Sequence, residues 1–259
     1  MARERQAVRG MIETQVQSGA GIAIVFDRRA GVVPDARWFD PAHWAALGRS
    51  SGMAGGRGGV MVVETPLGSC VLRHYRRGGI MARLSRDRYL WTGLARTRAM
   101  REFSLLADLS GAGLPVPVPV AARIVRDGLR YRADLLTRRI DDSRTLAALL
   151  AERAAGSAVA ERIGAMLARF HAAGVWHADL NAHNILVDGA GGVWLIDFDR
   201  CRRRAPARAW REANLARLRR SLEKLGVARC DGFEAGFWQP LLTAYHAAPS
   251  HVDAPGQGA

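Results

Sequence analysis

Short runs of apolar residues separated by turn residues predict β-strands in the first half of the chain. The predicted strands lie at 21–26, 60–64, 70–75, 124–125 and 131–137. Pro66-Leu67-Gly68-Ser69 separates the second strand from the third and is typical of a hairpin turn. Apolar residues at helical spacing predict one longer helix, 96–109, and Asp40-Pro41 indicates the start of a short helix.

The second half of the chain changes to helical spacing after Asp141-Asp142. The predicted helices lie at 145–155, 159–170 and 208–225. Two short apolar runs, 185–187 and 193–196, flank a glycine-rich turn and predict a hairpin. The pattern therefore predicts an α+β fold with a strand-rich first part, a joint near 137–142 and a helix-rich second part. A cleft between the two parts is the expected ligand site.

The charge of the chain is strongly positive, at +14 from 38 basic and 24 acidic residues. Lys224 is the one lysine, so the other 37 basic residues are arginines. A GC-rich genome explains the preference for arginine over lysine but not the excess of bases over acids. The excess favours an anionic partner: nucleic acid, an acidic membrane surface or a phosphorylated substrate.

The cysteines and the apolar runs limit the class of protein further. Cys70, Cys201 and Cys230 are far apart in sequence, which argues against a disulfide framework and a zinc site and fits a reducing cytoplasm. The segment 1–10 is charged and lacks the apolar run of a signal peptide. No stretch approaches the roughly 18 apolar residues of a membrane-spanning helix. We therefore expect any membrane association to be peripheral.

The residues best suited to chemistry follow the helix 159–170. A loop carboxylate at Asp179 can accept the proton of an attacking hydroxyl group. The predicted hairpin brings Asp197 beside Asn184, and their carboxylate and amide oxygens suit a Mg²⁺ ion that bridges the phosphates of ATP. A turn or cap role is the simpler interpretation of Asp179 or Asn184 alone. Asp197 is harder to dismiss, because a carboxylate within an apolar run is costly without a partner or metal.

The order and spacing of these residues resemble the protein-kinase-like superfamily. There, His-Arg-Asp-Leu with an Asn five residues after the Asp precedes Asp-Phe-Gly; here the stretches are 177–184 and 197–199. The resemblance implies one domain, 1–259, with an antiparallel-sheet N-lobe (19–137), a mostly helical C-lobe (142–247) and a frayed tail (248–259). It implies that Asp179 is the catalytic base and that Asn184 and Asp197 are the metal ligands.

The nucleotide-binding part of the predicted N-lobe matches less closely. Glycines precede the strand 60–64, where a loop over the phosphates belongs: Gly55, Gly56, Gly58 and Gly59. Arg73 occupies the position of the phosphate-binding lysine and keeps its charge, with a different geometry. Glu102 in the helix 96–109 would be its ion-pair partner. The alternative for Glu102 is an ordinary solvated helix residue.

Departures from protein kinases narrow the family. Asn181 replaces the lysine usual in Ser/Thr kinases, and Asp199 replaces the glycine of Asp-Phe-Gly, which makes that loop less able to flip. Together with Arg73, these residues are similar to bacterial 3-deoxy-D-manno-octulosonic acid (Kdo) kinases of the lipopolysaccharide kinase family. The similarity covers roughly 19–245. Its main stretches are 38–41, 71–79, 87–90, 113–117, 131–137, 177–186, 194–199 and 214–222.

This similarity implies ATP-dependent phosphorylation of the 4-hydroxyl group of Kdo on a Kdo-lipid A precursor in lipopolysaccharide core biosynthesis. It implies ATP and Mg²⁺, a lipid-linked acceptor and an anionic membrane, at the cytoplasmic face of a Gram-negative inner membrane. Neither nucleic acid nor a protein partner is implied. Arginines suited to the substrate, each otherwise a solvated surface residue, are Arg76, Arg77, Arg83, Arg86, Arg88, Arg200, Arg202, Arg203 and Arg204.

Three other hypotheses remain open from the sequence. A kinase for another sugar of the lipopolysaccharide core, such as a heptose, or for an antibiotic would share all the chemistry. A nucleic-acid-binding protein with vestigial kinase motifs is favoured by Arg73 in place of lysine. It is disfavoured by the intact Asp179, Asn184 and Asp197 and by basic runs without interleaved aromatic residues. A catalytically inactive scaffold of the same fold is the third.

Overall fold

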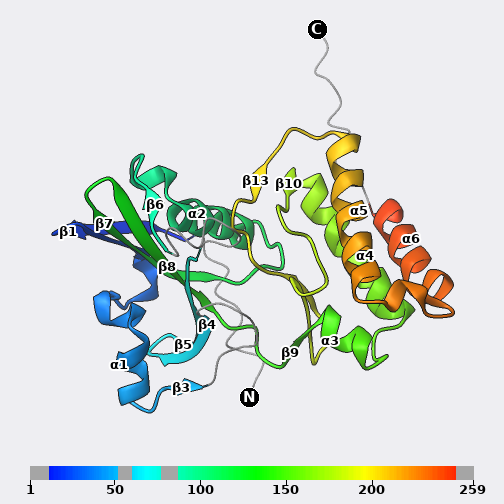
Figure 1. The fold of residues 1–259 in the computed structure, drawn as a ribbon, viewed down its shortest axis with the longest axis horizontal. Coiled ribbons are helices and arrows are strands. Elements are labelled where there is room, and N and C mark those ends of the chain that lie inside the picture. Colours follow the sequence, from blue (N-terminus) through cyan, green and yellow to red (C-terminus); the bar gives the residue numbers. More distant parts are fainter. Residues whose placement is uncertain (1–11, 52–59, 77–86, 249–259) are drawn as a thin grey trace, which may run out of the picture. The chain divides into compact units, whose positions relative to one another are not determined.

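The computed structural model describes residues 12–51, 60–76 and 87–248. The chain divides into two compact units, Met1–Gly113 with Pro117–Arg139 and Leu114–Val116 with Ile140–Ala259. The first unit is rich in strands and the second in helices (Figure 1). This composition confirms the α+β class predicted from the sequence. The predicted lobe limits, 19–137 and 142–247, stay predictions.

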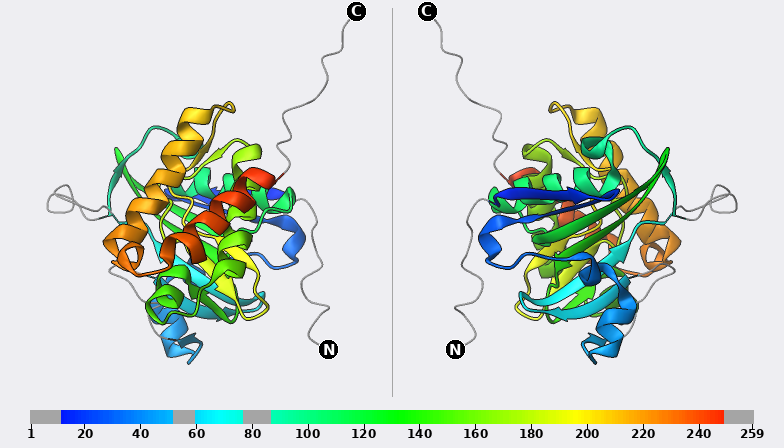
Figure 2. Two further views of the ribbon diagram at one scale, coloured as in Figure 1. Left: turned by 90° about the vertical axis from the view of Figure 1, so that its right-hand side faces the viewer. Right: turned by 90° about the vertical axis from the view of Figure 1, so that its left-hand side faces the viewer.

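The first unit is built on an antiparallel sheet. Its strands are β1 (Thr14–Gly19), β2 (Ile22–Asp27), β3 (Ser50–Ser51), β4 (Val60–Thr65), β5 (Gly68–His74), β6 (Tyr89–Leu90), β7 (Pro119–Asp127) and β8 (Arg130–Arg138). Among the described residues they form one eight-stranded sheet in the order β1-β2-β7-β8-β5-β4-β3, with β6 paired to β8 (Figure 2). The α-helices of this unit are α1 (Pro41–Ala46) and α2 (Arg98–Gly111).

The predicted hairpin is formed by β4 and β5, with Val62 opposite Val71. Gly68 has φ +100°, a conformation that a side chain disfavours, and it closes the turn. The hydroxyl of Thr65 donates to the Gly68 carbonyl at 2.9 Å. The alternation along β5 places Leu72 in a buried cluster and sends Arg73, its neighbour, to the opposite face.

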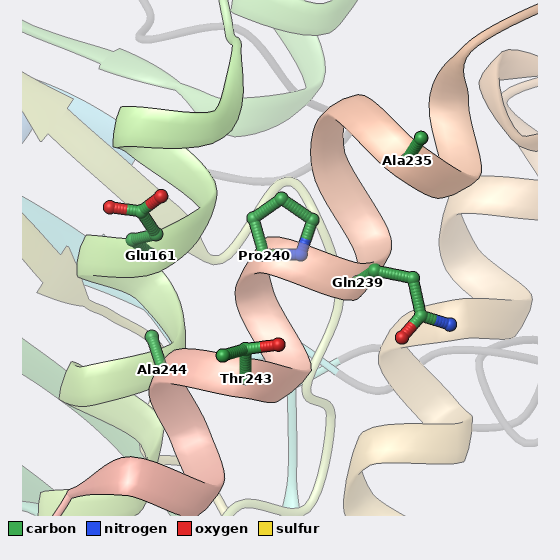
Figure 3. Close-up of a pocket in the computed structure, with 6 residues that line it drawn as sticks. All are labelled: Glu161, Ala235, Gln239, Pro240, Thr243 and Ala244. Carbon is green, nitrogen blue, oxygen red and sulfur yellow. The ribbon is translucent and has the colours of Figure 1, made fainter.

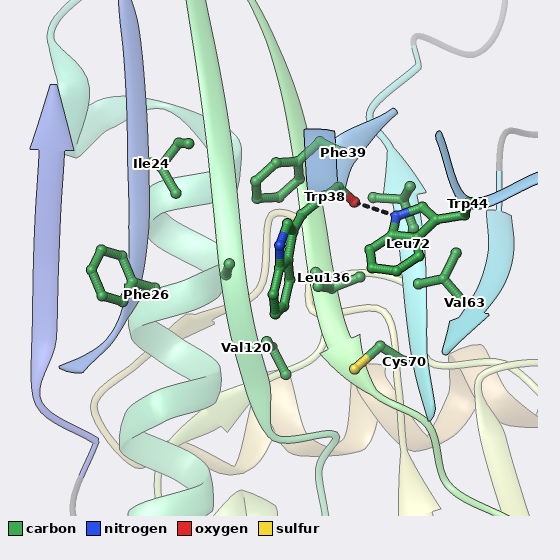
Figure 4. Packing of buried hydrophobic residues seen from close by; sticks show 11 residues of the cluster. Ile24, Phe26, Trp38, Phe39, Trp44, Val63, Cys70, Leu72, Val120 and Leu136 are labelled. Carbon is green, nitrogen blue, oxygen red and sulfur yellow. Dashed lines mark hydrogen bonds between the residues drawn. The ribbon is translucent and has the colours of Figure 1, made fainter. Parts of the chain in front are cut away.

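Aromatic residues cover one face of this sheet (Figure 4). Trp38, Phe39 and Trp44 come from a 3₁₀ turn (Ala36–Phe39) and from α1, and they pack with buried residues of β4, β5 and β8. The indole Nε1 of Trp44 donates to the Trp38 carbonyl at 2.8 Å, which satisfies the polar atom that its burial would leave unpaired. Asp40 caps α1 by accepting from the amide of Ala42. This packing anchors β5 in the core of the unit through Cys70 and Leu72.

The second unit combines helices with short strands. Its α-helices are α3 (Leu146–Ala151), α4 (Ser157–Ala172), α5 (Arg208–Lys224) and α6 (Gln239–Ala247), and a π-helical turn (Glu234–Trp238) precedes α6. Its strands are β9 (Ser143–Thr145), β10 (Val175–Trp176), β11 (Ile185–Asp188), β12 (Val193–Leu195) and β13 (Arg202–Arg203). The strands pair as β12-β11-β9 and as β10-β13. The helix predicted at 145–155 is shorter than expected, because Thr145 already caps it and Ala151 ends it.

Helix α4 packs closely against α6 (Figure 2). Gly164 permits this approach, since a Cβ atom at this position would overlap the carbonyl oxygen of Leu241. The buried face of α4 includes Ile163, Leu167 and Phe170. The amphipathic pattern that predicted this helix therefore reflects burial against the rest of the unit.

Candidate active site

The loop that carries Asp179 joins β10 to β11. His177 is buried at its start, and its Nε2 donates to the Ile196 carbonyl at 3.1 Å. Its Nδ1 accepts from the backbone amide of Asp179 at 3.3 Å. Burial lowers the pKa of His177, so the ring is neutral and can make one bond of each kind. His177 thus orients the loop from inside the fold.

Two asparagines fix the rest of this loop. The Nδ2 groups of Asn181 and Asn184 both donate to the carbonyl of Asp179, at 3.0 and 2.9 Å. The Oδ1 of Asn181 accepts from the amides of His183 and Asn184, which closes a tight turn. Asn181, first noted as a departure from protein kinases, is therefore a structural residue of the loop. Because its nitrogen is engaged, Asn184 presents its amide oxygen, and no hydrogen bond to that oxygen is made within the described residues.

The hairpin of β11 and β12 brings the third predicted residue to the same place. Ile196 donates its amide to the Asn184 carbonyl at 3.0 Å, so Asp197 follows directly on the strand that pairs with Asn184. Both Asp179 and Asp197 lie close enough to His177 to favour its charged form. Asp197 has φ +63°, a costly conformation for a residue with a side chain that is tolerated at functional sites. The positive φ therefore lies at Asp197 and not at Asp199.

The residues present fit a magnesium ion by donor type. Asp197 offers carboxylate oxygens and Asn184 an amide oxygen, the hard ligands that Mg²⁺ takes in proteins. The described residues hold no group of three or more His, Cys, Asp or Glu side chains arranged as a metal site. Mg²⁺ is usually bound by one or two carboxylates, with the remaining ligands from phosphates and water.

Helix α5 holds the Asp179 loop at three points. Asn214, which is buried, accepts from the amide of His177 at 3.3 Å and donates to its carbonyl at 2.8 Å. Arg217 forms an ion pair with the carboxylate of Asp179. The hydroxyl of Ser221 accepts from the amide of Ala182 at 3.1 Å. The sequence predicted this helix but gave no sign that it contacts the loop.

Cys201 is a further contact that the sequence did not reveal. Its sulfur accepts from the amide of Ala178 at 3.2 Å and lies 3.9 Å from the Asp197 carbonyl oxygen. One side chain therefore joins the backbone of the two loops that carry Asp179 and Asp197. A cysteine with no paired spacing offers no signal of such a role in sequence.

A pocket of about 310 Å³ opens beside Asp179, between its loop and α5. Asp179 and Arg217, with side chains 46% and 45% exposed, both line it. A larger hollow of about 500 Å³ lies over α4, α6 and the π-helical turn and is shown in Figure 3. Among the described residues that line it, Glu161 alone is charged and none is predicted for catalysis. The smaller pocket is therefore the better candidate for substrate.

In the first unit, Arg73 of β5 forms an ion pair with Glu102 of α2. Glu102 is 3% exposed, so the alternative of a solvated helix residue is wrong. The hydroxyl of Tyr75 also donates to Glu102, at 2.6 Å, and burial raises the pKa of Tyr75. The pair matches the geometry expected from the sequence, and its role toward nucleotide stays a prediction. Gly55, Gly56, Gly58 and Gly59 lie outside the described residues.

This unit contains a second buried carboxylate, which the sequence pattern did not predict. Asp134 of β8 contacts His74 at 2.7 Å and accepts from Arg123 at 2.9 Å. The hydrogen bond to Asp134 raises the pKa of His74, whose other ring nitrogen lies 3.4 Å from Asp87. This network joins β5, β7 and β8 to Asp87 in the segment that precedes β6. Its member His74 lies next to Arg73 in sequence. The network supports β5 from the face opposite to Glu102.

Comparison with known proteins decides the family. The family model "Lipopolysaccharide kinase (Kdo/WaaP) family" matches residues 41–245. The chain belongs to this family. A protein of Stenotrophomonas maltophilia (strain R551-3) named 3-deoxy-D-manno-octulosonic acid kinase is 53% identical over 215 residues, 82% of this chain and 85% of that protein. Proteins of the same name from Xanthomonas campestris pv. campestris (strain B100) and Xanthomonas oryzae pv. oryzae (strain PXO99A) are 52% and 53% identical. They cover 82% and 87% of this chain and 85% and 90% of their own length.

Membership of the lipopolysaccharide kinase family confirms the resemblance drawn from the sequence and the phosphotransferase class. A kinase takes its phosphoryl group from ATP, so the donor follows from the family. In the described part of the chain, no helix combines the length and apolar character needed to cross a membrane.

Proposed function

We propose that this lipopolysaccharide kinase transfers the γ-phosphoryl group of ATP to the 4-hydroxyl group of Kdo on a Kdo-lipid A precursor. The observation that carries the proposal is the Asp179 loop, in which the side-chain nitrogens of Asn181 and Asn184 both donate to the Asp179 carbonyl while Arg217 pairs with the half-exposed Asp179 carboxylate. The relatives named Kdo kinases support Kdo as the acceptor.

In the proposed reaction, Asp179 accepts the proton of the attacking hydroxyl. The hydroxyl oxygen bonds to the γ-phosphorus while the bond to the β–γ bridging oxygen breaks, and ADP leaves with that electron pair. His177 and Asn214 hold the backbone that leads into the base, and Arg217 orients its carboxylate. Positioning of this kind accounts for much of the rate of phosphoryl transfer, since the protein supplies little covalent chemistry.

We further propose Asn184 and Asp197 as the residues that hold Mg²⁺. The ion would supply neutralisation of charge on the β- and γ-phosphates. Asn184 is aligned for this role by the bond from its Nδ2 to the Asp179 carbonyl, and Asp197 by the strand pairing through Ile196.

In the first unit we propose Arg73 as a phosphate contact of ATP. Its side chain is 22% exposed while it pairs with Glu102. Glu102 would hold Arg73 in position and would not itself contact the nucleotide. The glycines Gly55, Gly56, Gly58 and Gly59 complete the proposed nucleotide site.

The proposed place of action is the cytoplasmic face of the inner membrane. A lipid-linked acceptor lies in an anionic bilayer, and the net charge of +14 favours peripheral attraction to such a surface. Cosedimentation with phosphatidylglycerol vesicles should fall as salt rises. Binding that is indifferent to salt and to anionic lipid would contradict an electrostatic attachment.

The deciding experiment is an acceptor assay with purified protein, Mg-ATP and either Kdo-lipid A precursor or a heptosylated core acceptor. We expect transfer to the former, with the new phosphate mapped to the 4-hydroxyl by ³¹P–¹H NMR. Asp179→Asn should lower kcat by about 10²- to 10⁴-fold, the usual worth of a general base. Asp231→Asn, at an exposed residue of the same unit, is the control. Transfer to the heptosylated acceptor alone would instead favour a heptose kinase.

A further inference from the structure

One face of α5 concentrates positive charge beside the proposed base. Arg217, Arg220, Ser221 and Lys224 are spaced i, i+3, i+4 and i+7, so their side chains lie on one side of the helix. All four line the pocket of about 310 Å³, together with Asp179, Asn181 and His183. The pocket therefore combines a carboxylate that can accept a proton with three cations of α5.

The cations of this face differ in how they are paired. Arg217 is neutralised by Asp179. Arg220 and Lys224 form no ion pair with any residue in the described part of the chain. Arg219, the neighbour of Arg220 on another face, pairs with Glu223 and lies 2.7 Å from Glu234. Two cations that line a pocket without a described carboxylate partner leave it able to accept an anion.

Lys224 strengthens this contrast. It is the one lysine of the chain, against 37 arginines, so the composition that accounts for the other basic residues does not account for it. A lysine in the last turn also complements the helix dipole, but that effect does not extend to Arg220, a turn earlier. Arg220 is therefore the stronger test of the pocket.

We infer that Arg220 and Lys224 bind the carboxylate of the sugar acid acceptor and so present its hydroxyl group to Asp179. The inference rests on the proposed function, because it takes Kdo, a sugar acid by name, as the acceptor. Arginine binds carboxylates through a planar fork, and lysine adds a point charge. A pocket of this volume is at the lower end of small-molecule sites and suits a single sugar ring. Anchoring the acid at one side of the ring fixes where the hydroxyl points.

Kinetic measurements on Arg220→Gln, Lys224→Gln and the double variant test the inference. We expect KM for the Kdo acceptor to rise about tenfold for each single substitution, the worth of one charge-assisted hydrogen bond, with KM for ATP unchanged. Arg208→Gln is the matched control, since Arg208 lies on the same helix, is 91% exposed and is remote in sequence from the pocket face. Equal rises in both KM values, or no rise, would overturn the inference.

Changes to the acceptor show which anion is bound. Replacing the Kdo carboxylate of the acceptor by a carboxamide should raise the KM of wild type by the same factor as the double substitution does. The KM of the double variant should not rise further with this acceptor. With an acceptor whose lipid A phosphates are removed, the effect of the double substitution should persist. If that effect instead vanishes with the phosphates, the pocket binds a lipid phosphate and the carboxylate assignment is wrong.

Binding of the methyl glycoside of Kdo, followed by saturation-transfer NMR, separates this inference from the proposed reaction. Wild type should bind it and the double variant should not, whether or not phosphate is transferred. Binding through Arg220 and Lys224 without transfer would refute the reaction and keep the site. Transfer by wild type with equal binding by both proteins would refute the site and keep the reaction.

Discussion

Asn214 is the residue whose removal should test the support of the Asp179 loop most directly. Its Oδ1 accepts from the His177 amide and from Nε2 of His171, both at 3.3 Å, and its Nδ2 donates to the His177 carbonyl. His171 can donate from Nε2 because the hydroxyl of Tyr245 donates to its Nδ1 at 2.7 Å. Every polar atom of this buried cluster has a partner, so the cluster has one consistent arrangement.

Asn214→Ala would leave three of these partners unpaired. They are the amide and carbonyl of His177 and the Nε2 of His171, and Asn214 itself is only 2% exposed. A buried polar group without a partner costs about 1–3 kcal/mol. The lower end of that range for each of the three groups predicts a loss of about 3 kcal/mol in the free energy of unfolding. The backbone before Asp179 would also move, so kcat should fall with KM for ATP little changed.

Urea denaturation followed by tryptophan fluorescence measures the free energy of unfolding, and the acceptor assay measures kcat. Glu212→Ala is the control, because this exposed residue of α5 should change stability by less than about 0.5 kcal/mol. Asn214→Asp keeps the side-chain oxygen that accepts hydrogen bonds but loses the nitrogen that donates one. Its free energy of unfolding and its kcat should therefore lie between those of Asn214→Ala and wild type. A loss below about 1 kcal/mol for Asn214→Ala, with unchanged kcat, would refute a positioning role for this cluster.

Three further predictions concern charge and packing. Burial lowers the pKa of His171 to about 4, so the unfolded state takes up its proton first and stability falls as pH drops from about 6.5 toward 4. Between pH 7 and pH 5 this loss should be about 2 kcal/mol, and urea denaturation should show it removed in His171→Gln. Arg73→Gln removes the arginine that pairs with the buried Glu102 carboxylate and should cost about 3 kcal/mol by the same assay, part of which Glu102→Gln in the same chain restores. Gly164→Ala should lower the thermal midpoint, because its Cβ would overlap the backbone of α6, whereas Gly111→Ala meets no atom and should not.

His74 of the first unit opposes the predicted effect of pH on stability. His74 has a raised pKa through Asp134, so its contribution to stability is present at low pH and is lost as pH rises through the folded-state value. Buried His177 has a lowered pKa and acts in the same direction as His171. Only the difference between wild type and His171→Gln therefore isolates the effect of His171.

The parts of the fold that sequence could predict are those with a clear apolar period. β2, β4, β5, β8 and α4 have strongly patterned apolar residues because each buries a face. β1 was missed because its residues are mostly polar and exposed, and pairing with β2 alone makes it a strand. α6 was also missed, and the π-helical turn before it interrupts the helical period.

The same division applies to the candidate site. Asp179, Asn184 and Asp197 could be predicted together because a loop and a short hairpin connect them, so their spacing in sequence fixes their neighbourhood. Asn214 and Arg217 lie more than thirty residues from their partners, as sequence numbers show. Their contacts depend on how α5 packs, which no local pattern records. In the sequence, Cys201 could be considered only as a disulfide partner or a metal ligand. Its contacts with the backbone belong to neither class.

The roles of α5 residues separate by the depth of each side chain, and this separation predicts what substitutions along the helix will change. Asn214 is buried and bonded to backbone, so its loss should affect stability as well as rate. Arg217 contacts a half-exposed carboxylate, and surface pairs contribute little stability, so its loss should affect kcat while the fold remains. Arg220 and Lys224 are exposed and line the pocket, so they should affect the acceptor KM alone. A helix that merely supported the loop would give losses of stability at each of these positions in proportion to burial, with no change confined to the acceptor.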